Sequence, residues 1–365
     1  MPLPRRSHAS LLLAATLVLT SGPAHAGKKH EPLTADFSVQ QTWKIGGTGW
    51  WDYLTTDPNA HLLYIGRANR VQVVDTQTGK LVHEISGMQG VHGVALDPKG
   101  KLGYISDGAA NRVLVFDRTT FQVTASIASG GKNPDAILFE PTTRRVLTFN
   151  GRSRSFTAID TAKNAVLKTV LLPGKPEFAQ ADNEGHIYVN IEDRNFLVRI
   201  DAATLAVTAI WPIAPCDSPT GLALDRQDHR LFSVCEDNWM VVTNTDNGHN
   251  VATVPIGANP DGVRYDAARH LVFVSNGEGT LSIIEQKSPN KYGTLQTLDT
   301  QDGARTLALD GKTGKVYLAT ASFGPPPEPT LQDPSPRPAL LPDSFVVLVV
   351  ASPEPPTTAQ PNPKK

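Results

Sequence analysis

Seven polar residues recur at matching places along the chain, and their side chains differ from one repeat to the next. In chain order they are Asp52, His92, Asp135, Glu177, Thr220, Asp261 and Arg305. A purely structural role would favour the same residue each time, whereas this set is polar throughout and variable. We therefore interpret these positions as a candidate ligand-binding site.

A second polar set follows apolar segments that we expect to end beside the first set. Its members are Arg152, Glu192 and Glu278, together with Arg67, Asp107, Asn150, Asn190, Glu236 and Asn276. The turns after these segments are predicted to project the side chains over the mouth of a central channel. Carboxylates that converge there repel one another unless a cation, a proton or an arginine neutralises them.

The simplest neutralising group is a bound cation or a cationic ligand. Oxygen atoms from Asp135, Glu177 and Asp261 would suit calcium, magnesium or manganese, while His92 would admit zinc or iron. The structural alternative is that these side chains cap strands and form ion pairs between neighbouring repeats. His92 alone would be ordinary as a hydrogen-bonded interior histidine. Both interpretations stay open at this point.

Four aromatic residues fall near the same positions: Trp50, Trp51, Tyr53 and Trp239. We interpret most of them as packing between neighbouring sheets, because flat rings fill wedge-shaped gaps. The alternative is a stacking surface for a sugar or a peptide.

The elements that position these residues form a repeat. Four apolar runs, separated by turn formers such as Asp97-Pro98, occur at Gly93–Leu96, Leu102–Ser106, Val113–Phe116 and Val123–Ile127. The second run recurs at a spacing of about 40–44 residues, with marker residues Tyr64, Tyr104, Leu147, Tyr188, Phe232, Phe273 and Tyr317. One small sheet cannot bury both faces alone, so the repeat predicts an all-β fold, a seven-bladed β-propeller of four-stranded antiparallel blades over residues 38–350.

The ends of the repeat region predict how the ring closes. The last copy has strands at Thr306–Leu309, Val316–Thr320 and Phe345–Val350, and no fourth strand follows. The segment Val39–Ile45 resembles the fourth strands of other copies, so we expect it to complete the seventh blade. Closure of this kind removes exposed sheet edges.

An acidic residue sits between the first and second strands of every copy. The seven are Asp57, Asp97, Glu140, Asp182, Asp225, Asp266 and Asp310. Because the residue type hardly changes, we assign these carboxylates a structural role, bonding nearby backbone amides in the turns.

The N-terminal residues predict export. Arg5 and Arg6 precede an apolar run at Leu11–Leu19, and Ala24-His25-Ala26 is a small-x-small cleavage signal. Residues 1–26 are thus a predicted signal peptide and 27–37 a linker, which indicates a periplasmic or secreted protein. The alternative interpretation of residues 1–26 is an uncleaved anchor. No later segment reaches the roughly 18 apolar residues of a membrane span, so none is expected. We expect a monomer, since a closed ring needs no partner for stability.

The charge, the cysteines and the proline-rich stretches give further expectations about partners, cofactors and disordered segments. Removing Arg5 and Arg6 from 34 basic residues leaves 32 against 35 acidic ones, a net charge of −3, which argues against a nucleic-acid partner. Cys216 and Cys235 are expected to meet at one rim as a disulfide, with free thiols and a copper site as alternatives. Because the sequence has no Cys-x-x-Cys-His motif, covalent c-type haem is excluded.

Two stretches are rich in proline. Residues 324–342 are predicted to be a surface insertion, and residues 351–365 a disordered tail. The alternative role of the insertion is that of a partner-binding or lid segment.

Several segments resemble a known repeat. They are Tyr104-Ile105-Ser106-Asp107, Tyr188-Val189-Asn190 and Phe273-Val274-Ser275-Asn276, with turns such as Asp75-Thr76-Gln77-Thr78-Gly79-Lys80. Over about residues 38–350 the chain resembles the exported YncE-like members of the YVTN seven-bladed propeller family. It departs from that pattern at Glu192-Asp193 and at Cys235-Glu236-Asp237. The resemblance implies a propeller but no particular reaction, because related propellers include metal-dependent lactone hydrolases, redox enzymes and binding modules.

Two hypotheses about function follow. The first is an exported binding or interaction module whose acidic funnel holds a cation, a small ligand or a segment of a protein partner. The second is a metal-dependent, lactonase-like hydrolase, with Asp135, Glu177 and Asp261 as metal ligands and His92 as general base. The sequence has no Gly-x-Ser-x-Gly motif and no phosphate-binding glycine loop. We favour binding, with hydrolysis as the alternative.

Overall fold

The computed structural model describes Met1 and residues 36–330 and 336–352. The predicted signal peptide, the linker up to residue 35, residues 331–335 of the Pro-rich insertion and the tail from residue 353 lie outside the described residues. None of the described segments forms a helix long and apolar enough to cross a membrane.

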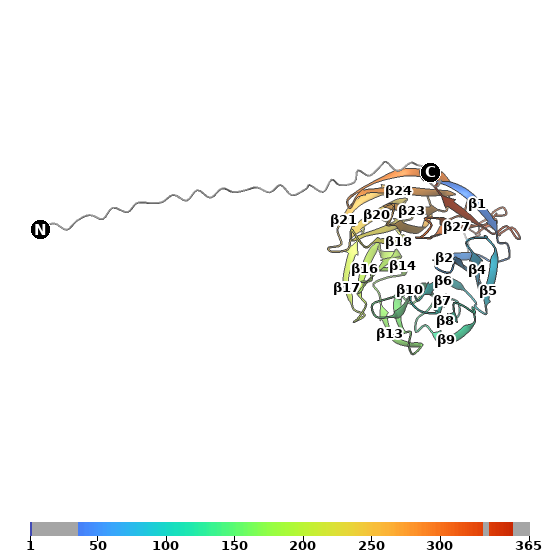
Figure 1. Cartoon of the computed structure of the whole chain (residues 1–365), viewed down its shortest axis with the longest axis horizontal. Helices are drawn as coiled ribbons and strands as arrows, with labels where there is room; N and C mark the ends of the chain where they lie inside the picture. Colours follow the sequence, from blue (N-terminus) through green and yellow to red (C-terminus); the bar gives the residue numbers. More distant parts are fainter. Residues whose placement is uncertain (2–35, 331–335, 353–365) are drawn as a thin grey trace, which may run out of the picture. The chain divides into compact units, whose positions relative to one another are not determined.

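The repeat folds as seven separate sheets of four antiparallel strands each. Figure 1 shows these sheets arranged as blades around a common centre, with the first strand of each blade innermost. One short 3-10 turn, η1 (Glu192–Arg194), is present and the described residues contain no α-helix. The predicted seven-bladed propeller is therefore confirmed.

Strands occupy equivalent places in all seven blades. The innermost strands are β2 (Trp51–Asp57), β6 (Val91–Leu96), β10 (Pro134–Glu140), β14 (Pro176–Ala181), β18 (Pro219–Asp225), β22 (Pro260–Asp266) and β26 (Thr306–Leu309). The second strands are β3 (Leu62–Arg67), β7 (Leu102–Asp107), β11 (Arg145–Asn150), β15 (His186–Ile191), β19 (Arg230–Cys235), β23 (Leu271–Asn276) and β27 (Val316–Thr320). The third strands are β4 (Arg70–Asp75), β8 (Arg112–Asp117), β12 (Ser155–Asp160), β16 (Phe196–Asp201), β20 (Trp239–Asn244), β24 (Thr280–Ser288) and β28 (Val346–Ala351). The outermost strands are β5 (Leu81–Ser86), β9 (Val123–Ala128), β13 (Ala165–Leu171), β17 (Val207–Pro212), β21 (Asn250–Pro255), β25 (Lys291–Asp299) and β1 (Ser38–Lys44).

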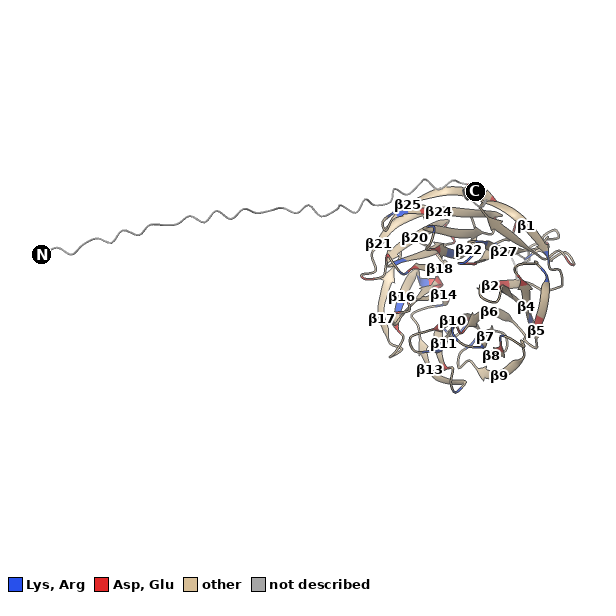
Figure 2. Cartoon of the chain, viewed as in Figure 1, with Lys and Arg blue, Asp and Glu red and all other residues tan. Residues whose placement is uncertain are grey.

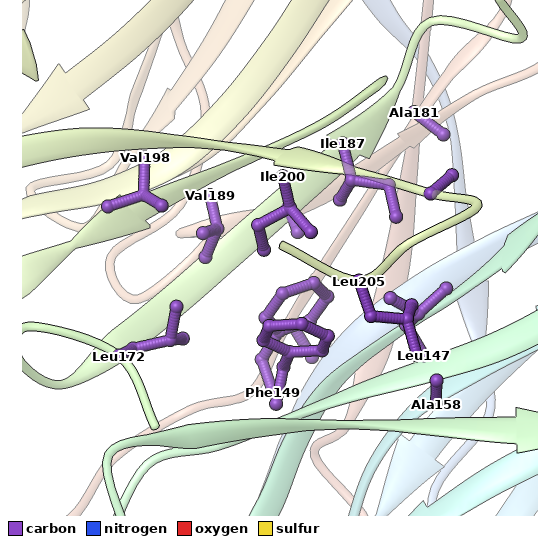
Figure 3. Close-up of a cluster of buried hydrophobic side chains, with 14 of the residues drawn as sticks. Leu147, Phe149, Ala158, Leu172, Ala181, Ile187, Val189, Val198, Ile200 and Leu205 are labelled. Atoms are coloured by element: carbon purple, nitrogen blue, oxygen red, sulfur yellow. The ribbon is translucent and has the colours of Figure 1, made fainter. Parts of the chain in front are cut away.

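The core lies between neighbouring blades, where the second and third strands are buried on both faces. Apolar residues of β11, β12, β15 and β16 pack together there, including Leu147, Phe149, Ile187 and Val198 (Figure 3). The outer strands carry the solvated surface; in β5 only Ile85 is buried. Burial on both faces explains why the second and third strands are near-continuous apolar runs. The outer strands are largely exposed, including apolar residues such as Leu81, Leu167 and Leu171.

The N-terminal strand closes the ring as predicted. β1 pairs antiparallel with β28, so that Trp43 lies opposite Val347. The indole of Trp43 is buried and packs on Tyr317, with ring centroids 5.4 Å apart. Blade seven therefore joins the two ends of the propeller chain and leaves no unpaired edge at this seam.

The acidic residues between first and second strands are structural, as predicted. Each carboxylate accepts hydrogen bonds from backbone amides two or three residues later in its turn, as Asp97 does from Lys99. Some also reach the next blade: Arg118 pairs with Asp57, and Arg144 with Asp97 at 2.7 Å. These turns define the lower rim of the ring.

Cys216 and Cys235 form a disulfide with a Cα–Cα distance of 5.4 Å. Cys216 precedes β18 and Cys235 ends β19, so the disulfide cross-links the inner hairpin of blade five. It lies at the upper rim, defined here as the end of the ring where first strands begin and second strands end.

Candidate functional site

The variable polar residues lie at the upper rim, in irregularities of the innermost strands. In six blades the pairing register of the first strand shifts around this position, as between Trp51 and Leu54 in blade one. A bulge of this kind redirects a side chain away from the regular alternation of a strand. Four of the bulges begin at proline, which fits a place where no ladder hydrogen bond is donated.

Asp52, His92 and Asp135 come together from the bulges of blades one, two and three. His92 Nδ1 lies 2.6 Å from Asp52 Oδ2 and 3.4 Å from Asp135 Oδ1. One ligand atom from each residue lies within 4.8 Å of the others. Asn133 Nδ2 lies 3.5 Å from Asp135 Oδ2, and the Asn133 side chain also hydrogen-bonds with His92. We call these three side chains the cation group.

Glycine leaves space beside the imidazole of this group. A Cβ atom at Gly108 would lie 2.5 Å from His92 Nε2, so any side chain there would displace the ring. Gly108 directly follows the second strand of blade two, and its lack of a side chain leaves the histidine in its present position.

Electrostatics in the cation group are strongly perturbed. Burial alone would lower the pKa of His92, but the hydrogen bond to Asp52 and the charges of Asp135 and Asp52 raise it to about 9. Burial raises the pKa of Asp135 to about 7, with His92 opposing and Asp52 adding to the shift. At neutral pH the imidazole is therefore protonated and pairs with the two carboxylates, and a metal ion bound by His92 would replace its proton.

Glu177 belongs to a neighbouring network rather than to the cation group. Its Oε2 lies 3.3 Å from Lys175 Nζ, and the hydroxyl of Tyr53 lies 3.4 Å from its Oε1. Lys175 also pairs with Glu192, the predicted rim residue that begins η1. Burial first, and the charge of Asp135 second, raise the pKa of Glu177 well above its usual value.

Asp261 and Arg305 form a pair on the opposite side of the channel. Asp261 Oδ2 lies 3.4 Å from Arg305 Nε. Burial raises the pKa of Asp261 to about 6, although Arg305 opposes the shift. The predicted metal set of Asp135, Glu177 and Asp261 is therefore not brought together: only Asp135 lies in the group found among the described residues, with Asp52 and His92.

A cavity of about 620 Å³ opens beside the cation group. His92, Asp135, Lys175 and the predicted residue Arg152 line it, with Asn133, Gly151, Arg154 and Asp193 completing the wall. Its size is within the usual range of small-molecule sites. Figure 2 shows both signs of charge on strands that border the centre of the ring.

Some predicted rim residues point elsewhere. Glu278 is exposed and accepts a hydrogen bond from Thr280 in its own hairpin. Asn150, Asn190 and Asn276 were expected over the channel mouth, but all three are fully buried. Their amides bond to hydroxyls of the following strand or, for Asn190, to carbonyls of blade five.

Arg67 was also expected at the channel mouth and is instead a buried structural residue. It donates to the carbonyls of Gly47 and Thr48, and its guanidinium lies 3.6 Å from the ring centroid of Phe345. It thus ties the loop after β1 to blade one. Asp107 pairs with Arg112 at 2.9 Å, which matches the structural alternative for that residue.

Three residues of the channel were not predicted as polar site residues: Lys175, Arg264 and the hydroxyl group of Tyr53. Lys175 precedes Pro176-Glu177 just as Asn133 precedes Pro134-Asp135, so the shared X-Pro-acid pattern could have identified it. Arg264 packs over Phe178 with its guanidinium 5.1 Å from the ring centroid, and burial lowers its pKa to about 10. No sequence signal distinguishes it from a surface arginine.

Comparison with known proteins agrees with the fold. No family model matches the chain. Two curated proteins, each called uncharacterized protein YncE and coming from Salmonella typhi and Salmonella typhimurium, are 25% identical over 224 residues. The alignment covers 60% of this chain and 51% of each relative, so the chain spans about half the length of the curated relatives it matches. The chain is a seven-bladed propeller similar in sequence to YncE.

Three solved structures are similar to this chain in fold alone. U3-55K has a TM-score of 0.71 at 11% identity and covers 87% of this chain and 99% of its own. The WD40 repeats of RRP9 give 0.71 at 11%, covering 88% and 99%. Hydrazine synthase from Kuenenia stuttgartiensis gives 0.66 at 15%, covering 81% and 96%. At these identities the similarity carries no information about ligand or activity.

Proposed function

We propose that this YncE-like propeller is an exported binding module whose channel mouth holds a divalent cation and, beside it, a small polar ligand or a segment of a protein partner. The observation that carries the proposal is the cation group: one imidazole and two carboxylates from three different blades, with ligand atoms within 4.8 Å of one another. Export is supported by the disulfide, since such bonds persist in oxidising compartments.

The donor set favours zinc or manganese over calcium and magnesium. Calcium takes six to eight oxygen ligands, and magnesium is held mainly by carboxylates and water. An imidazole nitrogen with two carboxylate oxygens suits zinc, and three protein ligands leave at least one position for a ligand. His92 and Asp135 also line the cavity of about 620 Å³, so that open position would face it.

Binding is favoured over hydrolysis by the place of His92. The hydrolase hypothesis needs this histidine as a general base that is separate from the metal ligands. Among the described residues His92 is the nitrogen donor between Asp52 and Asp135, so in this proposal it is a metal ligand that loses its proton when the metal binds, and it does not act as a general base. The remaining channel carboxylates, Glu177 and Asp261, are already paired with Lys175 and Arg305.

Metal analysis of the purified protein tests the proposal. We expect about one zinc or manganese per chain when the protein is prepared without chelators. In a thermal melt, free metal at about 100 times its Kd stabilises the fold by about 2.7 kcal/mol, a rise in Tm of roughly 5 °C. His92→Ala should abolish both the bound metal and the Tm rise.

His186→Ala is the matched control. His186 Nδ1 pairs with Asp182 Oδ2 at 2.7 Å, so it is a histidine bonded to one carboxylate but lies at the lower rim. This variant should keep the metal response of the wild type. The proposal fails if no divalent metal raises the Tm of the wild type, or if His92→Ala responds as strongly as His186→Ala does.

A further inference from the structure

A second cavity lies at the upper rim, where blades six, seven and one meet. Its volume is about 370 Å³ and it is lined by Trp50, Trp51, Phe323, Arg305 and Arg337, with Asn259, Gly277, Gly303 and Pro338 completing the wall. We call it the aromatic pocket. It shares no lining residue with the cavity beside the cation group.

One wall of the aromatic pocket is a stack of flat rings. The indoles of Trp50 and Trp51 are stacked with centroids 5.8 Å apart at 27°, and Phe323 lies 6.0 Å from Trp50. Trp51 is buried and also packs on Phe345, while Trp50 is 37% exposed. A buried ring therefore holds an exposed one in place, which makes a platform on which a planar ligand can stack.

Two guanidinium groups give the aromatic pocket a positive charge. The guanidinium carbon of Arg337 lies 5.7 Å from the ring centroid of Trp50. Arg305 directs Nε toward Asp261 at 3.4 Å. The remaining N–H groups of Arg305 and the guanidinium of Arg337 match a carboxylate, which arginine binds through two parallel hydrogen bonds. A cationic ligand would be repelled here.

The two ends of the Pro-rich insertion pair with each other and contribute residues to the wall of the aromatic pocket. Phe323 forms an antiparallel bridge with Leu340, and backbone bonds join Gly324 to Ala339 and Leu341 to Ser322, each at 2.8 Å. These bonds join the two arms to each other, with Phe323 on one arm and Arg337 on the other. The pocket is preformed, so binding there loses little conformational entropy.

We propose that the aromatic pocket binds a small planar aromatic carboxylate. The ring would stack on Trp50, and the carboxylate would lie between Arg305 and Arg337. The volume is near the lower end of the range for ligand pockets, which fits a ligand of one or two fused rings. This site is independent of the proposed cation group.

Calorimetric titration of the mature protein with benzoate and indole-3-carboxylate tests the assignment. Benzamide serves as a neutral probe of nearly the same shape, and benzylamine as a cationic probe of similar size. We expect the carboxylates to bind and to change tryptophan fluorescence, benzamide to bind at least tenfold more weakly, and benzylamine not to bind. Raised salt should weaken binding of the carboxylates.

Two variants and one control locate the site. Arg337→Gln and Trp50→Ala change exposed side chains and should each weaken benzoate binding at least tenfold, with the melting curve unchanged. Trp239→Ala removes another tryptophan at the upper rim, 36% exposed but outside the pocket, and should bind benzoate as the wild type does. The proposal is overturned if benzamide binds as tightly as benzoate, if neither carboxylate binds at millimolar concentration, or if Arg337→Gln retains full affinity.

Discussion

The pair formed by Asp261 and Arg305 allows a quantitative prediction about the channel. Asp261 is 15% exposed, and burial raises its pKa from 3.8 to about 6 in spite of the arginine. The ionised carboxylate is therefore less stable in the folded protein than in the unfolded chain. At about 1.4 kcal/mol for each pKa unit, this difference corresponds to a destabilisation of about 3 kcal/mol.

The sign of the pH dependence follows from linkage. Because the folded pKa is the higher one, the destabilisation is absent below the unfolded pKa of 3.8, grows as the pH rises, and is complete above about 6. Asp261→Asn removes the charge and keeps the shape. We expect the variant to be about as stable as the wild type at pH 4 and more stable by up to about 3 kcal/mol at pH 7.5.

Urea unfolding at pH 4, 5.5 and 7.5 measures this difference, with the slope m checked for constancy. Asp246→Asn is the control, since Asp246 is an exposed carboxylate paired with His229 and its loss should change stability by about 0.5 kcal/mol or less at every pH. If Asp261→Asn is less stable than the wild type at pH 7.5, or if its advantage does not depend on pH, the electrostatic account of the channel is wrong.

Three further predictions concern the scaffold. Replacing Cys216 and Cys235 by serine opens a disulfide with a sequence separation of 19, and should lower the free energy of unfolding by about 3 kcal/mol in urea titrations. Trp43→Ala removes a buried indole from the closing strand, where it packs on Tyr317, and should cost about 3–5 kcal/mol; a loss below 1 kcal/mol would mean that closure contributes little. Burial would raise the pKa of Glu140, but hydrogen bonds from Thr142 and Thr143 in its turn outweigh burial and hold that pKa below 4.5. Glu140→Gln should therefore lower the free energy of unfolding by about 1–3 kcal/mol at pH 7, and by progressively less as the pH falls through the pKa of Glu140. Urea midpoints at pH 7 and pH 3 measure this difference.

The fold could be predicted from sequence because its signals are local. Each blade is marked by apolar runs and turn residues that depend on near neighbours alone, and the period of the repeat fixes the ring. The place of Asp52, His92 and Asp135 at the start of the first strands followed from the same register. The closing strand was predictable because the last copy lacks a fourth strand.

The contacts within the site could not be predicted in the same way. A bulge turns a side chain by an amount that the alternation of a strand does not reveal, so the grouping of Asp135 with Asp52, and not with Glu177 and Asp261, depends on three-dimensional geometry. The burial of Asn150, in contrast, could have been predicted from the sequence. Its burial was signalled by Ser155 and Thr157, which alternate on the following strand and bond its amide.

Blade one links the two proposed sites through neighbouring residues. Trp51 lies in the wall of the aromatic pocket, and Asp52 belongs to the cation group. The same bulge, between Trp51 and Leu54, positions both side chains. Consecutive side chains of a strand point to opposite faces, and here Asp52 reaches His92 while Trp51 packs on Phe345. The rim thus places an acidic group and a basic aromatic pocket on either side of one strand, and a glycine or proline change in this bulge would disturb both sites at once.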